Sequence, residues 1–433
     1  MSLSVTQKQK YSLLVFSILN IWFFIYLAKA DYIMSKDSIG YINNHIIRTP
    51  TFPLLLDLFQ LIFKSSYLSM VVYFQIVSSF VCSYILINTL QKYFKFGEYI
   101  FLFLYVTLLY PLYSLKLSNQ ILPDSLAYSC FILTINFLVV YFFKRNIKSL
   151  LTVLLLSVIS ATIRPQFIFF YGVNLFIILF HIVKSKSLRH GLILFVVFIA
   201  TVFASSMFQR SYNYIYHGYF LTIPFTGIQL VTPQLYLSDK DDLHVFKDFP
   251  EDQRIFLDRV YSEIEERGLN YRGRDKIAMP LAFHYNAAYN VICWNVVATN
   301  YFKSENTSQV TPRQFIDLEN LMLSVSLKLL SLNYIEFIEL YIADIIAGLG
   351  FTGSFILCLF TITFIALVIK TKSDIYFLFL MIYIAALANC MLIAMVEPVI
   401  KRYTFYTDML QLVFTTIFLF IYVRDSGQDF FKK

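Results

Sequence analysis

Long apolar runs alternate with short polar connections along most of this chain. A helix needs about 20 apolar residues to cross the hydrocarbon core of a bilayer, and ten runs approach that length. The ten predicted spans are residues 11–30, 66–91, 98–113, 125–143, 149–163, 166–183, 191–209, 350–369, 375–395 and 404–423. The pattern therefore predicts an all-α polytopic membrane protein. It has a membrane region over 1–209, a long polar region over 210–349 and a second membrane region over 350–433.

The composition supports a membrane location. Hydrophobic residues make up 58% of the chain and charged residues only 14%, whereas a soluble domain is close to half apolar and a quarter charged. The formal net charge of +8 would favour a nucleic-acid partner if the basic residues formed one patch. They are instead spread over the connections between spans, so we expect membrane lipids, and no nucleic acid, as partners.

The basic residues define an orientation. Every second connection is basic, and these connections hold Lys8, Lys10, Lys92, Lys95, Lys144, Arg145, Lys148, Lys184, Lys186, Arg189, Lys370, Lys372, Arg424, Lys432 and Lys433. By the positive-inside rule this set is cytoplasmic, together with both termini. The external set comprises 31–65, 114–124, the Arg164-Pro165 turn, 210–349 and 396–403.

The long external region is predicted to be helical and docked on the rest of the protein. Residues 251–267 suit an amphipathic helix, with a buried face at Ile255, Phe256, Val260 and Ile264. Residues 311–350 have the pattern of helices that lie along a membrane surface. One acidic group is either a solvated turn or a site for a divalent cation: Asp239, Asp241, Asp242, His244 and Asp248.

Charged residues gather at the external ends of several spans: Asp31, Asp37, Asp124, Arg164, Glu397, Lys401 and Arg402. Helices from different parts of the chain bring such ends together at one membrane face. There, cations can neutralise a lipid phosphate through forked hydrogen bonds, and a carboxylate can take a proton from an acceptor hydroxyl. Structural explanations stay open, because cations near span ends meet lipid headgroups, and Asp37 and Asp124 are each placed to cap a helix.

The order of these segments resembles the polytopic glycosyltransferases of the GT-C fold, which are related to protein mannosyltransferases and aminoarabinose transferases. The first external loop of that family carries an Asp followed by a Tyr, and then an Arg with spaced prolines. Here "DSIGY" (37–41) and "RTPTFP" (48–53) match these pieces. The segments "LPDSLAYSCF", "ATIRPQFIFF" and "EPVIKRYTFY" resemble later parts of the family pattern. The prolines that usually follow the last Arg-Tyr are missing.

The resemblance implies an integral membrane glycosyltransferase of the bacterial inner membrane. It implies inverting transfer of a sugar from a polyprenyl-phosphate donor to an extracytoplasmic glycan, lipid or protein acceptor. The expected catalytic base is Asp37, with Asp124 and then Asp31 as alternatives. The expected donor-phosphate ligands are Arg48, Arg164 and Arg402, and the expected substrate-positioning residues are Tyr41, Glu397 and Tyr403. Ser38 replaces the usual second acid, so the acidic pair that would hold a divalent cation is incomplete. A divalent cation stays open as an alternative, and no other cofactor is expected.

Two other functions share the topology. An O-antigen-type polymerase or ligase also has about ten spans and a large external loop, and it would use loop arginines rather than Asp37. A flippase or transporter of lipid-linked sugars would have a water-filled path lined by charges. Ionisable residues inside the spans are the sequence sign of such a path. The predicted spans hold almost no such residues, which favours the transferase.

The orientation can be tested with reporter fusions. Fusions at Lys148 and Lys372 should report the cytoplasm and a fusion at Asp242 the outside, because the basic connections stay on the cytoplasmic side. An external reporter at Lys148 would contradict the assignment and would misplace Asp37 relative to an external donor.

Overall fold

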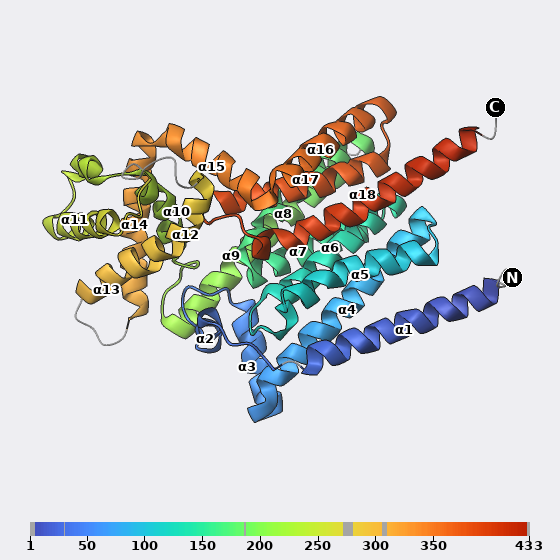
Figure 1. Cartoon of the computed structure of the whole chain (residues 1–433), viewed down its shortest axis with the longest axis horizontal. Coiled ribbons are helices and arrows are strands. Elements are labelled where there is room, and N and C mark those ends of the chain that lie inside the picture. The colour runs from blue at the N-terminus through green and yellow to red at the C-terminus, as the bar shows by residue number, and fades with distance from the viewer. Residues whose placement is uncertain (1–4, 30, 186–187, 272–279, 305–309, 431–433) are drawn as a thin grey trace. The chain divides into compact units, whose positions relative to one another are not determined.

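The computed structural model describes residues 5–29, 31–185, 188–271, 280–304 and 310–430, and the chain in these ranges is helical (Figure 1). No β-strand occurs in these ranges; one isolated parallel bridge joins Ile33 and Gln120. The prediction of an all-α fold is confirmed.

The chain divides into two compact units. The first contains residues 1–212, 359–387 and 405–433, and the second contains 213–358 and 388–404. The division passes through the last three helices, α16 (Phe351–Thr371), α17 (Asp374–Ala394) and α18 (Lys401–Phe430), so that each of them contributes residues to both units.

The first unit is built around α6, which packs against both α4 and α7. The α4–α6 interface is held by small hydroxyl side chains, because Ser79 lies 3.1 Å from Ser125 and 3.0 Å from Ser129, oxygen to oxygen. Small residues allow close helix packing in membranes, where hydroxyls also hydrogen-bond between helices. The elements of this part of the chain are α1 (Val5–Lys29), α2 (Lys36–Ile42), α3 (Thr51–Phe63), η1 (Lys64–Ser66), α4 (Tyr67–Phe94), α5 (Glu98–Ser114), η2 (Leu117–Asn119), α6 (Asp124–Lys144), α7 (Ile147–Ile163), η3 (Pro165–Ile168), α8 (Phe169–Ser185) and α9 (Leu188–His217).

A helix corresponds to each of the ten predicted spans, and in the described residues seven helical segments are long and apolar enough to cross a membrane. The segments that meet this criterion are 51–94, 124–144, 165–184, 191–217, 351–371, 374–394 and 401–424. The apolar parts of α1, α5 and α7 are shorter. The protein is therefore polytopic, and the count of ten crossings stays a prediction. α9 continues to His217, beyond the predicted end of its span at residue 209.

The second unit has its own hydrophobic core, although its sequence is largely polar. The buried residues of this core lie between Ile228 and Leu340. α10 approaches α14 closely at Gly227, where an added Cβ would lie 2.4 Å from the carbonyl oxygen of Glu319. The helices of this unit are α10 (Thr226–Leu237), η4 (Lys240–Phe246), α11 (Glu251–Glu266), α12 (Leu281–Asn290), the π-helix η5 (Val291–Ala298), α13 (Thr299–Ser304), α14 (Pro312–Leu332) and α15 (Tyr334–Leu349).

The amphipathic helix predicted over 251–267 is α11, and its buried face differs from the prediction by one residue. Phe256, Val260 and Ile264 are buried as expected. Ile255 is 47% exposed, and Leu257 is buried in its place. Ile255 therefore lies outside the buried face of the helix, because the face that packs against η4, η5 and α13 is centred on Val260.

Candidate functional site

The first external loop holds Asp37 and Arg48 as an ion pair. Ser35 caps α2 with its side chain and forms a capping box with Ser38, so the proposal that Asp37 caps this helix is wrong. Asp37 instead lies in the first turn and accepts a hydrogen bond from Arg48, Nη2 to Oδ1, at 2.8 Å. The side chain of Asp37 is 42% exposed and that of Arg48 is 20% exposed. The pair therefore lies at the surface of the first unit.

Arg48 is placed by its neighbours in the same loop. Its guanidinium carbon lies 4.9 Å from the ring centre of Tyr41, a cation–π distance. A Cβ at position 40 would lie 2.8 Å from Arg48 Nε, so Gly40 leaves the space that the guanidinium needs. The Nε of Arg48 is buried and has no hydrogen-bond partner among the described residues. One donor of the guanidinium is thus not used within this part of the chain.

Hydroxyl groups fasten this loop to the end of α7. Thr49 donates to the carbonyl of Ile163 at 2.7 Å, and the hydroxyl of Thr51 donates to that of Thr162 at 2.9 Å. These hydrogen bonds join the segment directly after Arg48 to the two residues directly before Arg164. A carboxylate–guanidinium pair is therefore held beside a second arginine that is distant in sequence.

Asp124 and Arg164 form the second ion pair, and this pair is buried. The side chain of Asp124 is 0% exposed and that of Arg164 is 11% exposed. Pro123 occupies the N-cap position of α6 and Asp124 lies in the first turn, so the structural alternative in which Asp124 caps this helix does not hold. Its carboxylate accepts a hydrogen bond from Arg164 at the end of α7.

Tyr406 on α18 completes this second pair, and the sequence reasoning missed it. Its hydroxyl donates to the backbone carbonyl of Asp124 at 3.3 Å, and Nη1 of Arg164 lies 3.5 Å from that hydroxyl. The predicted aromatic of this segment was Tyr403. The signal that was available is helical spacing, because residues three apart share a face of a helix, which made Tyr406 as good a candidate as Tyr403.

Both ion pairs act on the buried phenol of Tyr41. Burial raises the pKa of Tyr41 above its ordinary value. The positive charges of Arg48 and Arg164 lower the pKa in part, and the negative charges of Asp124 and Asp37 raise it. The structure thus brings five of the residues chosen from the sequence into one charged cluster. Four separate elements contribute to it: α2, the loop before α3, the start of α6 and the end of α7.

The remaining predicted site residues lie elsewhere. Asp31 is exposed, in the segment before the Ile33–Gln120 bridge. Glu397, Arg402 and Tyr403 belong to the second unit. The expectation that Arg164 and Arg402 bind the same donor phosphate stays a prediction.

Within the second unit, Glu397 accepts a hydrogen bond from Gln229 on α10. The phenols of Tyr285 and Tyr289 lie near the Glu397 carboxylate. Both are buried, and within the described ranges of the chain neither hydroxyl has a hydrogen-bond partner. Burial raises the pKa of both phenols, and the charge of Glu397 raises it further. No motif distinguishes these two residues in the sequence, because "FHYNAAYN" (283–290) has the pattern of an ordinary helix.

The acidic group after α10 is organised as a turn. Asp239 caps η4 and forms a capping box with Asp242. Asp248 pairs with Lys328, Nζ to Oδ2, at 2.7 Å, and this hydrogen bond lowers the pKa of Asp248. Among the described residues no group of three or more His, Cys, Asp or Glu side chains is placed to hold a metal ion. These local contacts support the turn and give no support to a cation site there.

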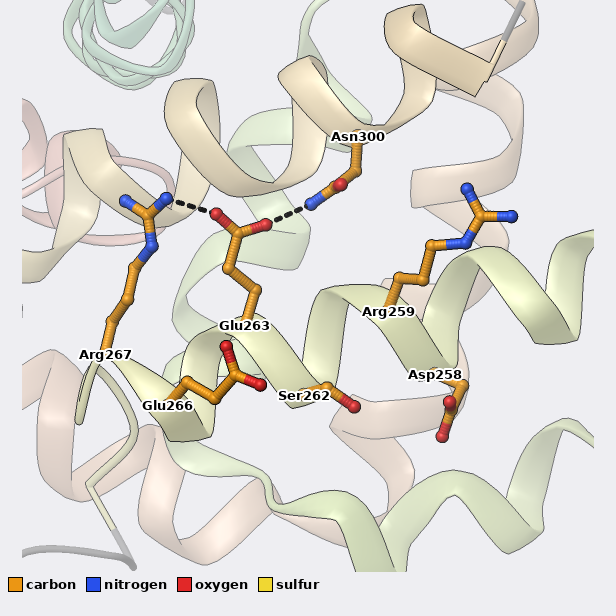
Figure 2. A pocket seen from close by; sticks show the side chains of 7 residues that line it. All are labelled: Asp258, Arg259, Ser262, Glu263, Glu266, Arg267 and Asn300. Atoms are coloured by element: carbon orange, nitrogen blue, oxygen red, sulfur yellow. Dashed lines mark hydrogen bonds and ion pairs between the residues drawn. The ribbon is translucent and has the colours of Figure 1, made fainter.

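An open depression of about 360 Å³ lies along α11 (Figure 2). Glu263 lies at its centre, between Arg267 and Asn300, and accepts a hydrogen bond from each. Surface pairs of this kind contribute little energy. Because these polar groups already satisfy one another, we assign no function to the depression.

Comparison of the chain with protein-family models, with curated proteins and with solved structures finds no match. The functional argument therefore rests on the chemistry of the charged cluster.

The two ion pairs should differ in their effect on stability. Arg164→Ala leaves the Asp124 carboxylate buried without a counter-ion, and we expect a loss of about 3–5 kcal/mol in the free energy of unfolding. Arg48→Ala leaves Asp37 in contact with water, and we expect a loss of about 0–1 kcal/mol. Unfolding of the purified protein in detergent measures both. Adding Asp124→Asn to Arg164→Ala should recover part of the loss; equal losses for the two arginine variants would contradict the assignment.

Proposed function

We propose that this protein is a glycosyltransferase of GT-C type, which transfers a sugar from a polyprenyl-phosphate donor to a hydroxyl of an extracytoplasmic glycan, lipid or protein. The observation that carries the proposal is the convergence of two Asp–Arg pairs on Tyr41 at the ends of apolar helices. Two arginines suit a lipid phosphate, since a guanidinium offers forked donors that match its oxygens. A carboxylate beside them suits deprotonation of an acceptor.

The two aspartates are assigned different roles because their environments differ. Asp37 is partly exposed, so an acceptor hydroxyl can approach it. Asp124 is fully buried and bound to Arg164, so it serves to hold that arginine in place. This difference supports Asp37 as the base and places Asp124 below it, and Asp31 lies in an exposed segment outside the cluster.

The reaction follows from this assignment. The acceptor oxygen bonds to the anomeric carbon of the sugar while the bond from that carbon to the phosphate oxygen breaks. The acceptor proton passes to the Asp37 carboxylate. The negative charge on the departing phosphate is stabilised by Arg48 and Arg164, since fixed positive groups lower the barrier where charge develops. The partnerless Nε of Arg48 supports this role.

The cellular setting is part of the proposal. Ten crossings would place both termini in the cytoplasm of a bacterial cell and the charged cluster at the outer face of the inner membrane. In Figure 1 the start of α1 and the end of α18 lie at the same end of the first unit, while α2 and α3 lie at the other end. This arrangement agrees with termini on one side and the first loop on the other.

Residues of the second unit are assigned to substrate positioning. Glu397 and Tyr403 lie near the buried phenol of Tyr289, whose hydroxyl has no hydrogen-bond partner among the described residues. Arg402 directly precedes Tyr403, and we assign it to the donor phosphate on the pattern "EPVIKRY". No metal ion is needed in this scheme, because the charge of the phosphate is met by arginine.

Asp37→Asn tests the base. The amide keeps the shape and removes the basicity, so we expect the variant to fold, insert and bind donor while transfer falls by about 10²–10⁴-fold. The measurement is turnover of a polyprenyl-phosphate sugar by the protein in membranes. The matched control is Asp31→Asn, which should keep nearly normal turnover. Near-normal turnover of Asp37→Asn would direct attention to Asp124, or to a polymerase or ligase that relies on loop arginines.

Alanine variants test the phosphate contacts. Arg48→Ala, Arg164→Ala and Arg402→Ala should each weaken donor binding, because a phosphate without its cations is costly in a dry site. Lys should restore only part of the affinity, since it lacks the fork. Binding of a labelled donor to the purified protein measures the effect.

Comparing the three variants distinguishes two causes of weaker donor binding, which are misfolding and the loss of a phosphate contact. Arg164→Ala also leaves Asp124 unpaired, so a loss there can reflect misfolding. Arg48→Ala and Arg402→Ala do not disturb that buried pair and report on the phosphate alone. Unchanged donor affinity in both of these variants would refute the assignment.

A further inference from the structure

α15 presents an apolar face to its surroundings. Ile335, Ile338, Ile342 and Ile346 are 61%, 52%, 51% and 42% exposed. Their spacing of three, four and four residues puts them on one side of a helix. We call these four residues the isoleucine face. A contiguous stripe of exposed large apolar side chains is typical of a surface that contacts an apolar partner.

The opposite side of α15 fixes the helix to its own unit. Leu340 and Asp344 are each 2% exposed. The Asp344 carboxylate accepts a hydrogen bond from the backbone nitrogen of Val399 at 2.9 Å, and α15 packs against α12. The isoleucine face is therefore directed away from the core of the second unit, and turning it inward would break these contacts.

The chain around α15 places the helix at a membrane boundary. A single residue, Gly350, separates α15 from α16, one of the helices long and apolar enough to cross a membrane. Gly350 has φ +74°, a conformation that ends a helix, and the chain changes direction there (Figure 1). Phe351 and Phe355, at the start of α16, are 80% and 60% exposed. The isoleucine face is thus followed directly by the apolar surface of a spanning helix.

α15 does not suit a second crossing. Its 16 residues would extend about 24 Å at 1.5 Å per residue, less than the hydrocarbon core of about 30 Å. Glu336 and Glu339 lie in its first half. Helices that reverse direction are joined by about two to five residues, and one residue separates α15 from α16. At its other end the chain bends by 100° into α14.

We propose that α15 lies in the lipid–water interface of the membrane, with the isoleucine face inserted among the lipids. A helix with one apolar face that is joined directly to the start of a span can bury that face at the boundary of headgroups and acyl chains while its polar side stays in water. The inference does not depend on the proposed transferase activity. It assigns the partner of the face as the lipid bilayer, and not as a second protein surface.

Depth-dependent quenching of tryptophan tests the proposal. The chain has two Trp residues, so the probe Ile342→Trp is made in a Trp22→Phe, Trp294→Phe background. The full-length protein is reconstituted in phosphatidylcholine vesicles that carry bromine either near the headgroup or near the chain ends. We expect stronger quenching by the shallow bromines than by the deep ones.

Two control variants calibrate the measurement. Ile255→Trp on α11 replaces another exposed isoleucine of the same unit, 47% exposed, and should be quenched by neither lipid. Ile362→Trp in α16 replaces one that is 67% exposed and should be quenched most by the deep bromines. Ile338→Trp gives a second reading on the isoleucine face if Ile342→Trp fails to fold.

The outcomes separate the alternatives. A probe on the isoleucine face that behaves like Ile255→Trp would overturn the proposal, because the face would then be covered by protein or exposed to water. A probe quenched like Ile362→Trp would also overturn it, because α14 and α15 would then form a broken span. Loss of transferase activity in these variants would leave the quenching result unaffected.

Discussion

The buried pair of Asp124 and Arg164 is the interaction on which the first unit most depends. An isolated charge in an apolar interior costs several kcal/mol, and a carboxylate at 0% exposure has no water to lower that cost. The partner must therefore be present and correctly placed. This requirement fixes the start of α6 against the end of α7, and Tyr406 extends the constraint to α18. Three helices are thus held together by one charged contact.

The first loop is built on this fixed point. Thr49 and Thr51 bond to the last residues of α7, so Arg48 is carried to the neighbourhood of Arg164. The Asp37–Arg48 pair has the same chemistry as the buried pair, yet it lies nearer to solvent. Solvent screens an exposed pair, which makes it weak and exchangeable. A buried pair is suited to structure, and an exchangeable pair beside it is suited to binding a substrate.

The second unit follows different rules. Its buried part contains the phenols of Tyr285 and Tyr289 and the carboxylate of Asp344. Among the described residues, neither phenol hydroxyl has a hydrogen-bond partner. Buried polar groups are normally satisfied, so these two are the part of the unit that ordinary packing does not explain. The eight-residue π-helix η5 lies beside them in the chain, and such helices are frequent at functional sites.

The all-helical fold with long apolar helices, and the residue types of the charged cluster, can be predicted from the sequence alone. Apolar run length is a local property, and it identified a helix at each predicted span. The loop motif gave Asp37, Tyr41 and Arg48, which are close in sequence and also close in space. Which aspartate is both paired and buried follows from the packing of distant segments. That packing pairs Asp124 with Arg164, brings Tyr406 to the pair and leaves Ile255 exposed. These features depend on packing contacts between segments that are far apart in the chain. The hydrophobic periodicity of one segment is a local property, so it does not predict such contacts.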